Sequence, residues 1–222
     1  MDSFPSTLTP LQREILTALR EGPPFFLTGG AALASGYLRH RQSLDLDLFV
    51  VEAGELDRLG ALLERVAAQQ GWALETLRRY PGFRRYRVQR DKAATLLDLV
   101  HETAAQVVPL LAKPVHDGVR FDAIEDLVAN KLCAVLGRSE VKDLVDLYFL
   151  ADSGIDVLAH LDHANQKDAG LDPATLAYVL REMSTDPEGL LLLRPVAAGE
   201  LALFRDRLVD RLVQLAWPQH GG

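Results

Sequence analysis

Polar and apolar residues alternate along several stretches of the chain, which is the pattern of strands with one buried face. The clearest stretch is Ser43–Val50, where Asp45 and Asp47 share one face and the intervening leucines share the other. Residues 72–101 contain three such runs joined by short loops, which predicts that consecutive strands there pair in antiparallel fashion. Further apolar or alternating runs predict strands over Phe25–Leu27, Trp72–Tyr80, Phe83–Arg90, Ala94–His101 and Val115–Phe121.

Apolar residues recur at helical spacing in the other parts of the chain. Thr9-Pro10 has the residues of an N-cap followed by proline at the first helical position. Asp122 with Glu125 has the pattern of a capping box. The charge-rich stretch Asn165–Gly170 is expected to be a loop. Helices are predicted from Pro10 to about Leu19, over Ala31–Arg39, Leu56–Gln70, Ile124–Gly137, Glu140–Asp152, Pro173–Met183 and Gly199–Trp217.

This order of elements predicts an α+β fold with two lobes. A lobe over residues 1–121 has a mixed β-sheet flanked by helices, and residues 122–222 form a helical lobe. The 222 residues are enough for one large domain or two small ones. The N-terminus has neither a basic start nor an apolar core of a signal peptide, and no apolar run approaches the length of a membrane helix.

The composition indicates the cellular compartment of the protein and limits the kinds of partner that it can bind. The single cysteine, Cys133, excludes an internal disulfide and fits a reducing cytoplasm. The net charge of −7 argues against indiscriminate nucleic-acid binding and still allows a local basic site.

Two carboxylates on one strand face repel each other. At a separation of about 4 Å and an effective dielectric of about 20, the repulsion is ~4 kcal/mol. Asp45 and Asp47 therefore favour a bound cation, and hard divalent ions take oxygen ligands. The alternative is a pair of solvated aspartates neutralised by Arg39 or Arg41. Upstream, Gly29-Gly30 follows a strand, where glycine lets the backbone approach an anion closely.

Asp98 lies in the middle of an apolar strand, Ala94–His101. A buried carboxylate is costly unless it is paired or binds a metal. The alternative is a strand with one exposed face, on which Asp98 is only solvated.

A strongly basic stretch interrupts the acidic chain. Seven basic residues and one acid lie between Arg78 and Lys92, with three aromatic residues among them. Basic side chains mixed with aromatics suit phosphate contact and base stacking. The alternative is a solvated sheet edge that carries cations against aggregation. The candidate nucleic-acid contacts are Arg84, Arg85, Arg87 and Arg90, of which Arg85 and Arg87 share one strand face.

The stretches Thr28–Tyr37 (TGGAALASGY) and Arg41–Phe49 (R-x-S-x-DLDLF) resemble the first motif of the polymerase-beta-type nucleotidyltransferase superfamily, and most closely the AbiEii/AbiGii toxins. The resemblance implies a nucleoside triphosphate, two Mg²⁺ ions and an acceptor, which in some members is tRNA, together with a cognate antitoxin. It implies that Asp45, Asp47 and Asp98 are catalytic and hold the metal, and that Gly29, Gly30 and Ser43 support the phosphates. In place of the usual hydroxyl residue after the glycines stands Ala31, and whether Thr28 substitutes is open.

A second segment, 130–146, resembles the same family, with a lysine-leucine pair, an arginine and a basic-Asp-x-x-Asp run. The resemblance makes Lys131 catalytic and nucleotide-binding. Lys131 and Arg138 are seven residues apart and share a helix face, so together they can hold a triphosphate. The remaining nucleotide-binding candidates are Lys142, Asp143 and Asp146. The alternative is an exposed face with a Lys142–Asp146 pair.

The sequence therefore predicts an Mg²⁺-dependent nucleotidyltransferase that modifies RNA or tRNA as the toxin of a toxin–antitoxin system. Two alternatives remain at this point: transfer to a small molecule such as an aminoglycoside, and a non-catalytic nucleotide-binding or partner module of the same fold. The histidines show no metal-binding motif, and His160 with His163 is expected in a solvated loop.

Overall fold

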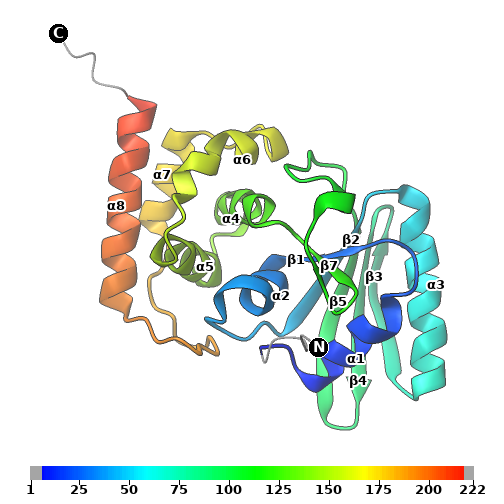
Figure 1. The fold of residues 1–222 in the computed structure, drawn as a ribbon. Coiled ribbons are helices and arrows are strands. Elements are labelled where there is room, and N and C mark those ends of the chain that lie inside the picture. Colours follow the sequence, from blue (N-terminus) through cyan, green and yellow to red (C-terminus); the bar gives the residue numbers. More distant parts are fainter. Residues whose placement is uncertain (1–6, 218–222) are drawn as a thin grey trace. The chain divides into compact units, whose positions relative to one another are not determined.

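A computed structural model describes residues 7–217 of the chain (Figure 1). The chain divides into two compact units, Met1–Ala123 and Ile124–Gly222. Residues 1–6, which belong to the stretch examined for a signal peptide, and His220 lie outside the described residues.

The first unit is built on a seven-stranded mixed sheet with the order β3-β4-β5-β2-β1-β7-β6. β2 runs parallel to β5 and antiparallel to β1, and β1 runs parallel to β7. The mixed sheet confirms the predicted α+β class. The strands are β1 (Phe26–Thr28), β2 (Asp45–Val50), β3 (Ala73–Tyr80), β4 (Phe83–Arg90), β5 (Ala93–His101), β6 (Val115–His116) and β7 (Val119–Phe121).

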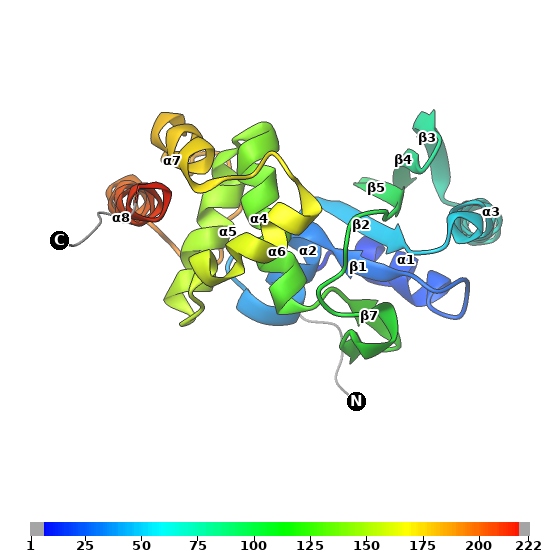
Figure 2. The same ribbon diagram turned by 90° about the horizontal axis from the view of Figure 1, so that it is seen from above.

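The period-two alternation has the expected effect in the two central strands. Leu46 and Leu48 of β2 and Leu97 and Leu99 of β5 have no exposed surface. Helices α1 (Pro10–Leu19) and α3 (Ala53–Gln70) pack beside the sheet and contact each other (Figures 1 and 2). The predicted N-cap of α1 is confirmed, because Thr9 and Gln12 form a capping box.

The helical segment expected over Ala31–Arg39 is confirmed, although it starts two residues earlier and consists of a short α2 (Gly29–Leu33) that continues as a π-helical turn, η1 (Ala34–Leu38). Two other local predictions for this unit were wrong. The strand expected over Val115–Phe121 is a hairpin of β6 and β7 that closes at Asp117-Gly118, both of which have positive φ. A 3₁₀ turn, η2 (Leu110–Ala112), precedes it.

Asp122 was predicted as the N-cap of the next helix, but that helix, α4, begins at Ile124. The carboxylate of Asp122 instead accepts hydrogen bonds from Thr28 and Lys113. Local spacing missed these contacts because Thr28 is 94 residues and Lys113 nine residues from Asp122, beyond the span of a capping pattern.

The second unit is helical. It contains α4 (Ile124–Arg138), α5 (Val141–Asp152), the 3₁₀ turn η3 (Val157–His160), α6 (Leu161–Lys167), α7 (Pro173–Glu182) and α8 (Ala198–Ala216). Helices α7 and α8 lie side by side, and Figure 2 shows α8 end-on. Within residues 7–217, no helix combines the length and apolar character that crossing a membrane requires.

The loop expected at His160 and His163 is also corrected. His160 ends η3 and His163 lies in α6, and both side chains are partly buried with ring centroids 5.7 Å apart. Burial, with the neighbouring His163, lowers the pKa of His160. The first three residues of the segment Asn165–Gly170, which was predicted as a loop, belong to α6, and the rest lie outside the helix.

Candidate functional site

Three aspartates lie together on one face of the central strands, and we call Asp45, Asp47 and Asp98 the acid face. Asp47 of β2 is the direct register partner of Asp98 of β5 in a parallel pair, and Asp45 lies two residues before Asp47. Asp98 is 7% exposed, whereas Asp45 and Asp47 are partly exposed. The strand that neighbours the Asp-x-Asp strand thus supplies a third carboxylate beside the predicted pair.

Arg85 of β4 joins this face. Its Nε and Nη2 donate to the two oxygens of Asp98 at 2.7 and 2.6 Å, a bidentate pair. The hydrogen bond to Asp98 raises the pKa of Arg85, burial opposes this, and the charges of Asp98, Asp45 and Asp47 raise it further. Arg85 therefore turns toward the carboxylates, a contact that the sequence analysis did not foresee.

The donor set of the acid face is made of carboxylate oxygens, which suit a hard divalent ion. Both oxygens of Asp98 already accept hydrogen bonds from Arg85. Among residues 7–217, no three His, Cys, Asp or Glu side chains come close enough together to hold a metal ion. Asp45 and Asp47 fit a metal by chemistry and exposure, and Asp98 fits only if it exchanges its contact with Arg85.

The glycine turn lies against this face. Gly29 has φ of +66°, and a Cβ there would overlap a carboxylate oxygen of Asp47. A Cβ on Gly30 would overlap the guanidinium of Arg41 and lie 3.2 Å from Ser43 Oγ. The backbone conformation favours glycine at Gly29, and at both positions a Cβ would displace a neighbouring side chain, that of Asp47 or Arg41. Arg41, considered from sequence only as a surface counter-ion, is 4% exposed beside this turn.

Thr28, Lys113 and Asp122 are buried next to the turn, and of these sequence reasoning missed Lys113. Thr28, the residue before Gly29, donates its hydroxyl hydrogen bond to Asp122 at 2.6 Å. Lys113 Nζ donates to the other oxygen of Asp122, also at 2.6 Å. The Thr28 proton is therefore directed at Asp122, so Thr28 is not poised to replace the missing hydroxyl at Ala31 as a phosphate donor.

The arginines predicted to bind nucleic acid are all paired with carboxylates. Arg87 bonds to Glu75 at 2.9 Å, and Arg90 forms a bidentate pair with Glu14. Arg84, 6% exposed, forms an ion pair with Asp57, and Arg85 holds Asp98. The nucleic-acid role of these four arginines stays a prediction. The edge-strand alternative is wrong for them, because β4 pairs with both β3 and β5. The predicted separation of Arg85 and Arg87 from Arg84 across the two strand faces is confirmed by the burial pattern of β4.

The second unit contains its own charged group, which we call the cation cluster: Lys131, Arg138, Asp143 and Asp146. Lys131 is 3% exposed and its Nζ lies 2.9 Å from Asp143 and 2.5 Å from Asp146. Arg138 reaches both oxygens of Asp143 at 2.7 Å, and its side chain is 46% exposed. Burial opposes ionisation of Asp143, but the hydrogen bonds and charges of Arg138 and Lys131 lower its pKa overall.

The alternative drawn from sequence for this segment was wrong. Lys142 pairs with Glu140 at 2.6 Å, whereas Asp146 pairs with Lys131, so the expected Lys142–Asp146 pair is replaced by a buried network. Lys142 remains partly exposed, with a side-chain exposure of 32%.

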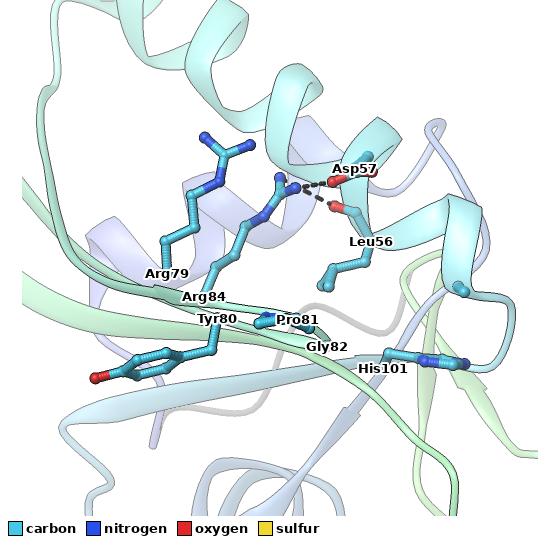
Figure 3. A pocket seen from close by; sticks show the side chains of 9 residues that line it. Leu56, Asp57, Arg79, Tyr80, Pro81, Gly82, Arg84 and His101 are labelled. Carbon is cyan, nitrogen blue, oxygen red and sulfur yellow. Dashed lines mark hydrogen bonds and ion pairs between the residues drawn. The ribbon is translucent and has the colours of Figure 1, made fainter.

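A cavity of about 390 Å³ lies in the first unit between the start of α3 and the β3–β4 turn (Figure 3). Figure 3 shows Arg79 and Arg84 pointing toward α3 and the ring of Tyr80 turned away. Arg84 and Arg85 are consecutive in β4, so the cavity opens on the face of the sheet opposite the acid face. It is therefore separate from the candidate site. Its lining residues are Ala53, Leu56, Asp57, Arg79, Tyr80, Pro81, Gly82, Arg84 and His101.

Comparison with known proteins places these features in a family. A family model described as nucleotidyl transferase AbiEii toxin, type IV TA system, matches residues 11–220. No curated protein matches this sequence. Among solved structures, the chain is similar to MenT4, a nucleotidyltransferase toxin from Mycobacterium tuberculosis, with a TM-score of 0.64 and 17% identity over 91% of this chain and 80% of that one. It is also similar to JHP933 from Helicobacter pylori, with a TM-score of 0.55 and 23% identity over 93% of this chain and 92% of that one.

Proposed function

Because the chain belongs to the AbiEii nucleotidyltransferase toxin family, we propose that its acid face transfers a nucleotide from a nucleoside triphosphate to an RNA acceptor, with Mg²⁺ as the metal. Membership makes the chain a nucleotidyltransferase toxin, and a type IV system implies an antitoxin partner. One observation carries the proposal: Gly29, Asp47 and Asp98 lie next to one another across three neighbouring strands or strand ends. The predicted cytoplasmic location stays a prediction.

The residues divide the work of the reaction as follows. The acceptor hydroxyl oxygen forms a bond to the α-phosphorus, the bond to pyrophosphate breaks, and the hydroxyl proton leaves. Asp45 and Asp47 would hold two Mg²⁺ ions with Asp98 as a further ligand, and the bound metal would neutralise charge on the phosphates. Backbone N–H groups at Gly29 and Gly30, with Ser43, support the triphosphate.

Asp98 also has the chemistry to accept the acceptor proton. Its two hydrogen bonds to Arg85 fix the orientation of the carboxylate next to Asp47. We assign Arg85 to this positioning role and no longer to nucleic acid. The role is supported by its contacts with Asp98 and by the charges of Asp45 and Asp47 acting on it.

In the second unit, the side chain of Arg138 is exposed and that of Lys142 is partly exposed, so each can exchange its carboxylate partner for a phosphate of the triphosphate. Lys131, Asp143 and Asp146 are buried, and we assign them to holding Arg138 in place. Lys131 thus acts through its partners in this proposal, although the family resemblance made it catalytic.

A cation without a carboxylate partner can contact an RNA phosphate without first giving up an ion pair. Arg78, Arg79 and Lys92, on the same basic stretch, have no hydrogen-bond or ion-pair partner within residues 7–217. We propose these three as phosphate contacts in place of the four paired arginines. For single-stranded RNA, each lost contact should flatten the salt dependence of binding by ~0.7 log units per log unit of salt.

The test is incubation of the protein with Mg²⁺, each of the four labelled triphosphates, and either total RNA or an aminoglycoside mixture. Label in RNA supports the proposal, whereas label only in the small molecules would replace RNA as the acceptor. Filter binding of tRNA across a salt series then compares Arg79→Gln with Arg87→Gln. If the salt dependence of tRNA affinity becomes less steep in the Arg87 variant and stays unchanged in the Arg79 variant, the paired arginines are the RNA contacts.

A further inference from the structure

A buried polar group lies beside the glycine turn and belongs to none of the predicted site residues. We call Thr28, Lys113 and Asp122 the Asp122 cluster. The Asp122 carboxylate accepts from Thr28 Oγ1 and from Lys113 Nζ, each at 2.6 Å. The backbone of Asp122 adds two more contacts: its N–H donates to Leu27 O at 2.8 Å, and its carbonyl accepts from Tyr37 Oη at 2.7 Å.

The ion pair in this cluster is removed from water. The side chains of Lys113 and Asp122 are 0% and 1% exposed. Lys113 Nζ also lies 4.7 Å from the centre of the Phe26 ring. Taking both charges out of water costs several kcal/mol per ion, so such pairs often stabilise a fold no better than packed apolar residues. A contribution to stability alone therefore does not account for the Lys113–Asp122 pair, so its position in the fold suggests another role.

The contacts of Asp122 enclose the glycine turn. Thr28 is the last residue of β1, Tyr37 lies in η1, and Gly29 and Gly30 lie between them. Thr28 is also the cross-strand partner of Asp47. One residue thus binds the chain on both sides of the turn that meets the Asp47 carboxylate.

We propose that Asp122 is a positioning residue that sets the Gly29–Gly30 turn against Asp47 for triphosphate binding, with Lys113 as its fixed counter-ion. The proposal rests on the function proposed above, which gives the turn its phosphate. Lys113 does not contact phosphate itself, because its ammonium group is buried and donates to Asp122. Thr28 is the residue directly before the turn, and the hydrogen bond from its hydroxyl to Asp122 fixes the position at which the turn begins.

Two double variants separate positioning from simple stabilisation. Lys113→Met with Asp122→Asn removes both charges but keeps an oxygen that accepts from Thr28. Lys113→Met with Asp122→Leu removes both charges and that acceptor as well. Calorimetric binding of each of the four nucleoside triphosphates with Mg²⁺ is measured beside urea unfolding. We expect the Leu variant to lose about tenfold or more in affinity and the Asn variant to stay close to wild type, as for outer-shell partners of ligands.

A second ion pair provides a matched control. Lys167 and Asp126 in the second unit are 2.9 Å apart, with side-chain exposures of 5% and 0%. Lys167→Met with Asp126→Asn should change the free energy of unfolding and leave triphosphate affinity unchanged. If the double variants of Asp122 do not fold, Thr28→Val and Thr28→Ser ask the same question: serine should restore the affinity that valine loses.

The outcomes are distinct. Equal affinities of the Asn and Leu double variants, or of Thr28→Val and wild type, overturn the positioning role while wild-type binding stands. Wild-type protein that binds none of the four triphosphates overturns the proposed function, and the positioning role with it.

Discussion

The acid face and the cation cluster both contain aspartates, but the aspartates of the two regions differ in burial and in their partners. On the acid face, Asp45 and Asp47 are partly exposed on a strand. In the cation cluster, Asp143 and Asp146 of α5 have no exposed surface and pair with cations of α4, of which Lys131 is buried and Arg138 about half exposed. A partly exposed carboxylate can exchange its contacts for a metal or a substrate, whereas carboxylates enclosed by cations mainly fix the geometry of those cations.

The strongest test of this contrast removes carboxylates from the acid face. Asp45→Asn and Asp47→Asn should each lower transfer by at least about 100-fold, since they remove the charge that would hold the metal. Each variant should fold as well as wild type or better, because one of two repelling charges is gone. Pyrophosphate release and urea unfolding are the measurements, and full activity in either variant would remove these residues from the chemistry.

In the cation cluster the largest effect should fall on stability. Lys131→Met leaves Asp143 and Asp146 buried without their shared ammonium group, so we expect a loss of ~3–5 kcal/mol in the free energy of unfolding. Triphosphate affinity, measured under conditions in which the variant is folded, should change less. A variant as stable as wild type that has lost binding would instead make Lys131 a direct substrate contact.

Arg85 pairs with a carboxylate of the acid face, Asp98, in the way that the cations of the cation cluster pair with Asp143 and Asp146. Arg85→Gln should lower transfer by about tenfold to 100-fold by releasing the orientation of Asp98. The control is Arg87→Gln, whose pair with Glu75 is about half exposed and contributes little. Equal activity of the two variants would show that the contact with Asp98 has no role in turnover.

The smallest expected effect is the response of the cation cluster to acid. The pKa of Asp143 is lowered in the folded protein, so its contribution to stability is present above the ordinary carboxyl pKa and is lost as the pH falls through the lowered value. The difference in free energy of unfolding between wild type and Asp143→Asn should therefore be constant near neutral pH and shrink below about pH 4. A difference that stays constant to lower pH would contradict the assignment.

The sequence predicted those features that depend on local pattern. Alternation placed Asp45 and Asp47 on one face, and the apolar run around Asp98 identified the strand that became their neighbour. Thr9 caps the first helix, which begins at Pro10 as expected. These signals are local because a strand face and a helix cap are decided by residues a few positions apart.

The missed features depend on partners far apart in the chain. Asp122 and Thr28 are 94 residues apart, and Arg90 and Glu14 are 76 apart. A run of arginines has the same sequence pattern whether it binds RNA or carboxylates on adjacent strands. Only the order of the strands decides between these, and it brings Asp98 and Glu75 to opposite sides of β4.

Nucleotidyl transfer is tested most directly by the position of the label in the triphosphate. Total RNA is incubated with Mg²⁺ and the protein, using nucleoside triphosphates labelled at either the α- or the γ-phosphate, with Asp47→Asn in parallel. Attack on the α-phosphorus predicts that α-label enters the RNA, that γ-label leaves as pyrophosphate, and that the variant does neither. Transfer of γ-label to RNA, or α-label incorporation equal to wild type in Asp47→Asn, would contradict the proposed acid-face chemistry.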